Sequence, residues 1–469
     1  MLPRQYGVNQ DVTFPSMNHV SCAVLAKGSD IPSEAALLYA ISKAMEAHPL
    51  LRATIEGDGE PDERIDLFQM VRKGDNSPCK FVAGGEAVFR AEDVLKIVDV
   101  KSEDSSDVEA SWRKTFLSDL DDGSTWCDVS SGRTPLWKLE LHRSSDEAAL
   151  VFSFNHAISD QSSASRLTDQ ILSLAADFES GSSTKTPSKQ NIPPSVEESV
   201  LGKDQRFKDI ETGGFGLGTV KYIGGKAMEE TMGPVILPDD SSNKSEGGGL
   251  AGALTTISGN AAGGEDEKSL ERKSVIAFRS LSKEATEKLL QSCRAKGVSI
   301  TNALSAALTL ASTDFVSGTD ASGKDRNYKI LQSLDMRRFG AALDKGESVG
   351  CLAGSMDLMH GDLKDGSGTA LLEGSEGSLD DFWKLAGEGK SQTADFIDSD
   401  GPVHAVRVFD FAMTISDLNN LVHLTAQSKD SQGRAYSAGF TNAGVYERFD
   451  AFGYEGEDAN SREKTSVRI

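Results

Sequence analysis

Cysteine is scarce in this chain of 469 residues, and its five copies are scattered, odd in number and without a C-x-x-C pair. This pattern argues against a disulfide framework and against a zinc cluster. No apolar run approaches the ~20 residues that span a bilayer. The N-terminal segment MLPRQYGVNQDVTF lacks the apolar core of a signal peptide. We therefore predict no membrane span and a cytoplasmic location.

Positive charge is also in short supply. Lys and Arg together number 49, against 72 Asp and Glu, which gives a formal net charge of −23 at pH 7. A field of this sign repels the phosphate backbone of nucleic acids and the surface of anionic lipid membranes. We expect neither nucleic acid nor a membrane surface to be a partner.

Three stretches of different composition follow one another along the chain. Residues 1–180 and 273–469 mix helix-like and strand-like patterns, which predicts an α/β fold class with two such domains. Residues 181–272 are rich in Gly, Ser and charged side chains, as in GSSTKTPSK and SSNKSEGGG. Such a segment buries too little apolar surface to offset its ordering entropy. We predict that it is a long crossover linker, largely disordered.

The first domain contains a pair of strands that the sequence marks clearly. Residues 135–143 and 147–157 are separated by a short polar turn, which predicts a hairpin. The second strand is apolar at nearly every residue, as expected when both of its faces are buried. A helix capped by Ser159 or Asp160 should follow it, and Ser33 should cap an earlier helix.

The second domain shows a similar succession of elements. Ser282 and Gly297 have the residue types that begin and end a helix. The expected elements are helices at 283–297, 302–312 and 379–387, and strands at 274–281, 328–337 and 435–449.

Two histidines are followed by an aspartate four residues later, namely His142 with Asp146 and His156 with Asp160. His142 runs into a polar turn, so we expect it at the surface. His156 ends the most apolar strand, where the chain leaves the sheet for a helix, and α/β proteins place ligands at such points. A neutral imidazole there can take a proton from a hydroxyl or an amine near pH 7. The alternative is a core histidine without a catalytic task.

Other catalytic patterns are missing from the sequence. It contains no G-x-S-x-G nucleophile elbow and no G-x-x-x-x-G-K-[ST] phosphate loop. Histidine and cysteine are not grouped at metal-ligand spacings. We expect no metal and no bound cofactor.

Several segments, in the same order, resemble the chloramphenicol-acetyltransferase-like acyltransferases. These include alcohol O-acetyltransferases, which the chain resembles most, and the condensation domains of peptide synthetases. The resemblance implies two α/β subdomains with mixed sheets and a tunnel at their interface. The matching segments are HPLLRATI, PLWKLELHR, ALVFSFNHAISD, GVSITNALSAAL, SLDMRR, VGCLAG and FTNAGVYE.

The resemblance also implies roles for individual residues. His156 of the H-x-x-x-D motif would be the general base acting on the acceptor. Asp160 would turn away from the substrate and pair with an arginine, Arg337 of SLDMRR in the first place and Arg52 in the second. Asn442 and Thr441 are positional candidates for binding the oxyanion or for holding a loop beside it.

The sequence departs from the family pattern in two places that bear on the tunnel. Gln161 stands where the family usually has glycine, and its side chain would narrow the tunnel or shift the loop. The polar, acidic stretch after Asn442 has no counterpart to the last strand and helix of relatives. The second subdomain would then be incomplete at its end.

The expected activity is transfer of an acyl group from acyl-CoA, as co-substrate, to a small molecule with a hydroxyl or amine, by a monomer. No carrier-protein segment adjoins the domains in this sequence, which favours free acyl-CoA as the donor. One alternative is a condensation-type enzyme that takes its acyl group from a carrier protein. Carrier proteins are usually acidic, so a chain with a net charge of −23 would repel them. A second alternative is a non-catalytic relative that binds a ligand or partner.

Overall fold

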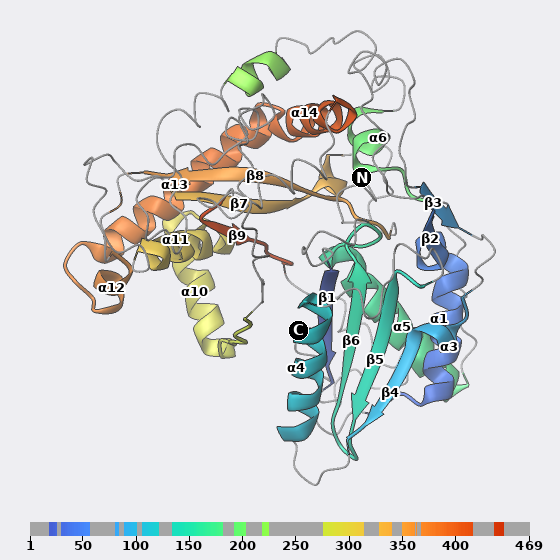
Figure 1. Cartoon of the computed structure of the whole chain (residues 1–469). Coiled ribbons are helices and arrows are strands. Elements are labelled where there is room, and N and C mark those ends of the chain that lie inside the picture. The colour runs from blue at the N-terminus through green and yellow to red at the C-terminus, as the bar shows by residue number, and fades with distance from the viewer. Residues whose placement is uncertain are drawn as a thin grey trace, which may run out of the picture.

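The computed structural model describes fourteen segments of the chain, which form three sheets: a four-stranded sheet, a three-stranded sheet and a small antiparallel pair, Ala53–Glu56 with Lys80–Ala83. Most of the helices pack on the two larger sheets (Figure 1). We refer to each of the two larger sheets with its helices as a lobe. The described residues are 18–25, 30–56, 80–83, 89–100, 106–121, 134–181, 192–202, 218–224, 275–313, 328–339, 349–361, 363, 367–415 and 436–444.

The first lobe is built on a mixed sheet with strand order β1-β6-β5-β4. Strand β6 is antiparallel to both of its neighbours, whereas β4 and β5 are parallel. Every residue of β6 is buried, which explains its nearly continuous apolar sequence. The strands are β1 (Asn18–Val24), β4 (Leu95–Asp99), β5 (Trp137–Arg143) and β6 (Ala148–Asn155).

Helices cover both faces of this sheet. Helices α1 (Glu34–Ala47) and α5 (Gln161–Ser180) share one apolar core with the sheet, and α4 (Ser106–Asp121) packs on the opposite face. The remaining elements of the lobe are small: η2 (Pro49–Arg52), β2 (Ala53–Glu56), β3 (Lys80–Ala83) and α3 (Ala91–Val94).

The second lobe has a smaller mixed sheet with strand order β8-β7-β9. Strand β7 (Tyr328–Asp335) pairs antiparallel with β8 (Ala353–His360) and parallel with β9 (Ala438–Phe440). The short helix η4 (Met336–Arg338) follows β7 directly. The long helices of this lobe are α10 (Lys283–Lys296), α11 (Ile300–Thr313), α13 (Ser378–Asp398) and α14 (Gly401–Ile415), and α12 (Ser367–Leu372) is short.

Helix α6 (Val196–Leu201) belongs to the predicted linker but packs in the second lobe. Its Val196 and Leu201 share an apolar cluster with Val406 of α14 and with Leu352. Most of the stretch 181–272 lies outside the described residues. The structure therefore tests neither the disorder expected of this stretch nor the expected domain boundaries, and both stay predictions.

The predicted helix ends match the structure. The side chain of Ser33 caps α1, that of Ser282 caps α10, and Gly297 ends α10 in the left-handed region at φ 67°. Of the two candidates for the cap of α5, the structure uses Asp160. None of the helices in the described part of the chain combines the length and the apolarity of a membrane span.

Two local predictions were wrong. Residues 275–281 form no strand. The segment does not join a sheet edge, because Phe278 packs against Trp112 and Phe116 of α4. His142 is buried rather than at the surface, since α4 covers that face of β5, and its Nδ1 lies 2.8 Å from Ser111 Oγ.

The strand predicted at 435–449 is much shorter in the structure. Only Ala438–Phe440 forms β9, the described residues 441–444 continue as a loop, and 445–449 lie outside the described residues.

Candidate functional site

His156 is the first residue beyond β6, at the turn that leads into α5. The buried side chain of Asn155 shapes this turn, because its Oδ1 accepts a hydrogen bond from the backbone N–H of Ala157 at 3.0 Å. The imidazole of His156 is half-buried. The structure therefore presents a partly accessible imidazole at the end of the most buried strand.

Aromatic rings surround one side of His156. The ring centroid of His19 lies 5.3 Å away with the two planes nearly perpendicular, and His19 in turn stacks on Phe154 at 4.7 Å. His19 reaches this place because β1 pairs with β6 and sets His19 opposite Phe154. Sequence reasoning missed His19, and no local signal marks it, since it lies in an ordinary strand pattern.

His19 is held as a neutral imidazole. Burial, together with the nearby charge of His156, lowers the pKa of His19 to about 4. Its Nε2 lies 2.6 Å from Oε1 of Gln161. An amide oxygen only accepts hydrogen bonds, so Nε2 of His19 carries the proton that it donates to Gln161.

Gln161 points its amide toward β1. Besides accepting from His19, it donates from Nε2 to Ser165 Oγ at 3.2 Å and to Ser21 Oγ at 3.5 Å. Gln161 thus joins the start of α5 to β1 by hydrogen bonds. The predicted narrowing of a tunnel by Gln161 stays a prediction.

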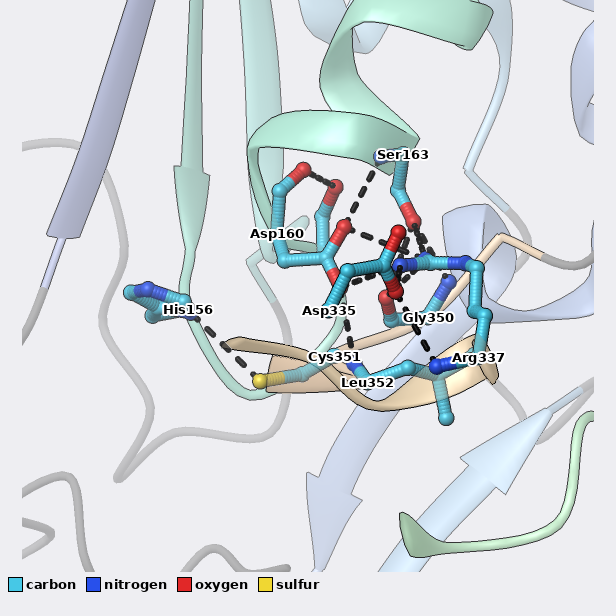
Figure 2. Close-up of polar contacts among 9 residues, drawn as sticks. His156, Asp160, Ser163, Asp335, Arg337, Gly350, Cys351 and Leu352 are labelled. Atoms are coloured by element: carbon cyan, nitrogen blue, oxygen red, sulfur yellow. Dashed lines mark hydrogen bonds and ion pairs between the residues drawn. The ribbon is translucent and has the colours of Figure 1, made fainter. Parts of the chain in front are cut away.

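Asp160 lies in a dense set of hydrogen bonds just before α5 (Figure 2). Its Oδ1 accepts from the backbone N–H of Ser163 at 2.8 Å, as a helix cap does. Its Oδ2 accepts from the backbone N–H of Leu352 in the second lobe, also at 2.8 Å. Arg337 adds one hydrogen bond to each oxygen, at 2.9 Å to Oδ2 and 3.1 Å to Oδ1. The structure thus pairs Asp160 with Arg337 and not with Arg52.

The balance of burial and charge keeps the Asp160 carboxylate ionised. Burial alone would raise its pKa, but the charge and hydrogen bonds of Arg337 and the two backbone N–H groups lower the pKa below its usual range. The pKa of Arg337 is raised, because the attraction to Asp160 and Asp335 exceeds the effect of its own burial. Both groups are therefore charged near pH 7 and neutralise each other.

Ser163 connects the same network to the segment before β8. Its Oγ donates to the carbonyl of Gly350 at 2.8 Å and accepts from Arg337 Nη2 at 2.7 Å. Cys351, the next residue, places its sulfur 3.5 Å from Nδ1 of His156 (Figure 2). In the sequence, VGCLAG was only one of the matching segments, and sequence reasoning did not identify its cysteine as a site residue.

No protein-family model matches the sequence, and neither does any curated protein. Solved structures are similar at 13–16% identity. The first condensation domain of the calcium-dependent antibiotic synthetase, in complex with a substrate analogue, has a TM-score of 0.51 and 13% identity, with 94% of this chain and 79% of that chain covered. The EpoB NRPS cyclization-docking bidomain from Sorangium cellulosum has a TM-score of 0.50 and 16% identity, with 94% and 69% covered.

The chain has the condensation-domain fold. This confirms the predicted α/β class with two subdomains and mixed sheets. The closer resemblance to alcohol O-acetyltransferases stays a prediction. In this fold, His156 follows β6, an inner strand of the first lobe's sheet, and Cys351 approaches it from the second lobe.

Asn442 and Thr441 lie in an exposed loop after β9. Asn442 donates from Nδ2 to Thr301 Oγ1 at 2.8 Å and accepts from the N–H of Gly444, so it holds the loop to the start of α11. Among the described residues, no hydrogen bond joins Asn442 or Thr441 to His156. Their predicted role near the oxyanion stays a prediction.

Within the segments that the structure describes, no three His, Cys, Asp or Glu side chains are grouped as metal ligands. The chemistry that the site offers is that of an imidazole, a neutral second imidazole and a thiol, next to a buried ion pair.

Proposed function

We propose that this protein transfers an acyl group from a thioester to a hydroxyl or amine acceptor, with His156 as the general base. The observation that carries the proposal is the position of the half-buried His156 imidazole where the two lobes meet, beside an ion pair that already satisfies Asp160. Because Asp160 is occupied by Arg337 and two backbone N–H groups, its task is support and not proton transfer.

The reaction needs one proton acceptor that later returns its proton. His156 would take the proton of the acceptor hydroxyl or amine as its oxygen or nitrogen attacks the thioester carbon. The tetrahedral intermediate carries its negative charge on the former carbonyl oxygen. When it collapses, the carbon–sulfur bond breaks and the leaving thiolate takes the proton from His156. Atoms and charge then balance, and His156 is neutral again.

The first candidate for the donor is acyl-CoA. The net charge of −23 disfavours docking of an acidic carrier protein over a wide surface. The phosphates of acyl-CoA are also negative, but a few Lys or Arg side chains at a local binding site would suffice to hold them. A carrier-linked thioester is the second candidate, because the two similar structures are domains of an antibiotic synthetase and of an NRPS. The site itself requires only that the acyl carbon be held as a thioester near His156.

Thiol release from purified full-length protein tests the proposal. The protein is incubated with acetyl-CoA or longer acyl-CoA and a panel of alcohols and amines, and free thiol is followed with time. Acceptor-dependent release that His156→Ala abolishes, at an unchanged melting temperature, supports the acyl-CoA proposal. His404→Ala, which removes a half-buried histidine of α14, is the matched control and should leave release unchanged.

The same assay separates the alternatives. Release from an acyl-carrier thioester but not from acyl-CoA supports the carrier-dependent reaction. No release above His156→Ala with either donor favours a protein that binds without catalysis. If His156→Ala unfolds the protein, the imidazole has a structural role in the core.

A further inference from the structure

A thiol from the opposite lobe contacts Nδ1 of His156. Cys351 Sγ lies 3.5 Å from this nitrogen, within the range of a hydrogen bond to sulfur, and the two residues are 195 positions apart in the chain. Figure 2 shows the sulfur between the imidazole and the segment that leads into β8.

The residues on either side of Cys351 are fixed by backbone hydrogen bonds. Gly350 donates its N–H to Ser163 Oγ at 3.0 Å, and its carbonyl accepts from Ser163 Oγ and from Arg337 Nη2. Leu352 donates its N–H to Asp160 Oδ2 at 2.8 Å. The position of the sulfur therefore depends on Asp160 and Arg337, which hold the backbone before and after it.

The thiol of Cys351 is neutral at physiological pH. Burial, reinforced by the negative charge of Asp160, raises the pKa of Cys351 to about 12. The thiolate is the nucleophilic form of cysteine, so a thiol with this pKa is poorly suited to attack a thioester. A neutral sulfur still accepts a weak hydrogen bond from an imidazole N–H.

We infer that Cys351 is a positioning residue for His156, and that its sulfur accepts the Nδ1–H, which places the lone pair that acts as the base on Nε2. The inference rests on the proposed function, in which His156 accepts a proton. A neutral imidazole has one N–H, so a proton on Nδ1 leaves Nε2 as the acceptor. Asp160 then orients His156 indirectly, through Leu352 and Cys351, and not by touching the ring.

The tautomer of His156 tests this inference without any substrate. Full-length protein labelled with ¹⁵N-histidine is studied at pH 7 by long-range ¹H–¹⁵N NMR, with His156→Ala to assign the signals. The expected result is the Nδ1–H tautomer in the wild type and a shift toward Nε2–H in Cys351→Ala. Cys351→Ser retains an acceptor atom and should keep Nδ1–H. Cys293→Ala, which removes a buried thiol of α10, should leave the signal unchanged.

Turnover adds a second measurement. Cys351→Ala should lower kcat about tenfold, the scale of one hydrogen bond, with KM nearly unchanged and partial recovery in Cys351→Ser. Wild-type His156 in the Nε2–H form, or the same tautomer in wild type and Cys351→Ala, would overturn the inference. An acyl group found on Cys351 by intact-protein mass spectrometry would also overturn it, because the thiol would then be a nucleophile.

The two proposals fail in different ways. A protein without thiol release but with the Nδ1–H tautomer contradicts the proposed function and leaves the positioning role intact. A protein that releases thiol with His156 in the Nε2–H form contradicts only the positioning role. If Cys351→Ala does not fold, the wild-type and Cys351→Ser spectra still decide the tautomer.

Discussion

Arg337 and Asp160 join the two lobes through a two-point ion pair, in which Nη1 lies 2.9 Å from Oδ2 and Nη2 lies 3.1 Å from Oδ1. The planar guanidinium matches both carboxylate oxygens, which a lysine would not do. Both residues are about 5% exposed. Because both groups are buried away from water, each charge is stabilised by the opposite charge of its partner.

Replacing Asp160 with asparagine should lower the free energy of unfolding by about 3–5 kcal/mol, because it leaves the buried guanidinium of Arg337 without its full counter-charge. Denaturant unfolding of the full chain measures the change. Asp99→Asn is the matched control, since its ion pair with Arg143 is largely exposed and should contribute at most about 1 kcal/mol. An Asp160→Asn variant as stable as the wild type would contradict the assigned role of the pair.

The contribution of Asp160 should also depend on pH. Its pKa is lower in the folded protein than the unfolded value of about 3.9. The unfolded chain therefore takes up the proton first, so the stabilisation is complete above that value and is lost as the pH falls through the folded pKa. The stability difference between wild type and Asp160→Asn should shrink below about pH 4. A difference that stays constant from pH 6 to pH 3 would rule out this linkage.

Gln161→Gly, which introduces the glycine that the resemblance led us to expect at this position, should destabilise the protein by about 1 kcal/mol through loss of the hydrogen bond to His19. Gln161→Ala removes the same hydrogen bond without adding backbone freedom, and the two variants together separate the side chain from the main chain. Thermal unfolding measures both. If Gln161→Ala melts like the wild type, the amide contributes nothing to holding β1 against α5.

His360 is a buried histidine at the end of β8. Among the described residues neither of its ring nitrogens has a hydrogen-bond partner, and the nearest carboxylate oxygen, Oε2 of Glu388, lies 3.9 Å from Nδ1. Burial lowers its pKa to about 4. The native state keeps the ring neutral, while the unfolded chain binds a proton below about pH 6.5, so stability is lost as the pH falls from there toward 4.

His360→Leu should therefore raise the free energy of unfolding by about 1 kcal/mol at pH 7, because it removes unsatisfied polar atoms. The advantage should grow toward pH 5. Denaturant unfolding at the two pH values measures this growth. A variant that is less stable at both values would show that the imidazole has a partner or a packing role that leucine cannot replace.

Local signals in the sequence were reliable where one short segment decides the outcome. Ser33 and Ser282 begin helices, and Gly297 ends one, by hydrogen bonds within their own turns, so their residue types sufficed to predict them. The strand 274–281 failed for the opposite reason. A strand forms only when it pairs with a neighbouring strand, and here Phe278 packs against Trp112 and Phe116 of α4.

The sequence by itself determined the two α/β halves, the buried strand that leads to His156, and the start of the next helix at Ser159 or Asp160. These depend on periodicity and capping, which act over a few residues. Only the tertiary structure decided that Arg337 meets Asp160, that Cys351 meets Nδ1 of His156 and that His19 stands beside it. Such contacts join segments far apart in the chain, and their distances follow from how the sheets and lobes pack, which no local pattern encodes.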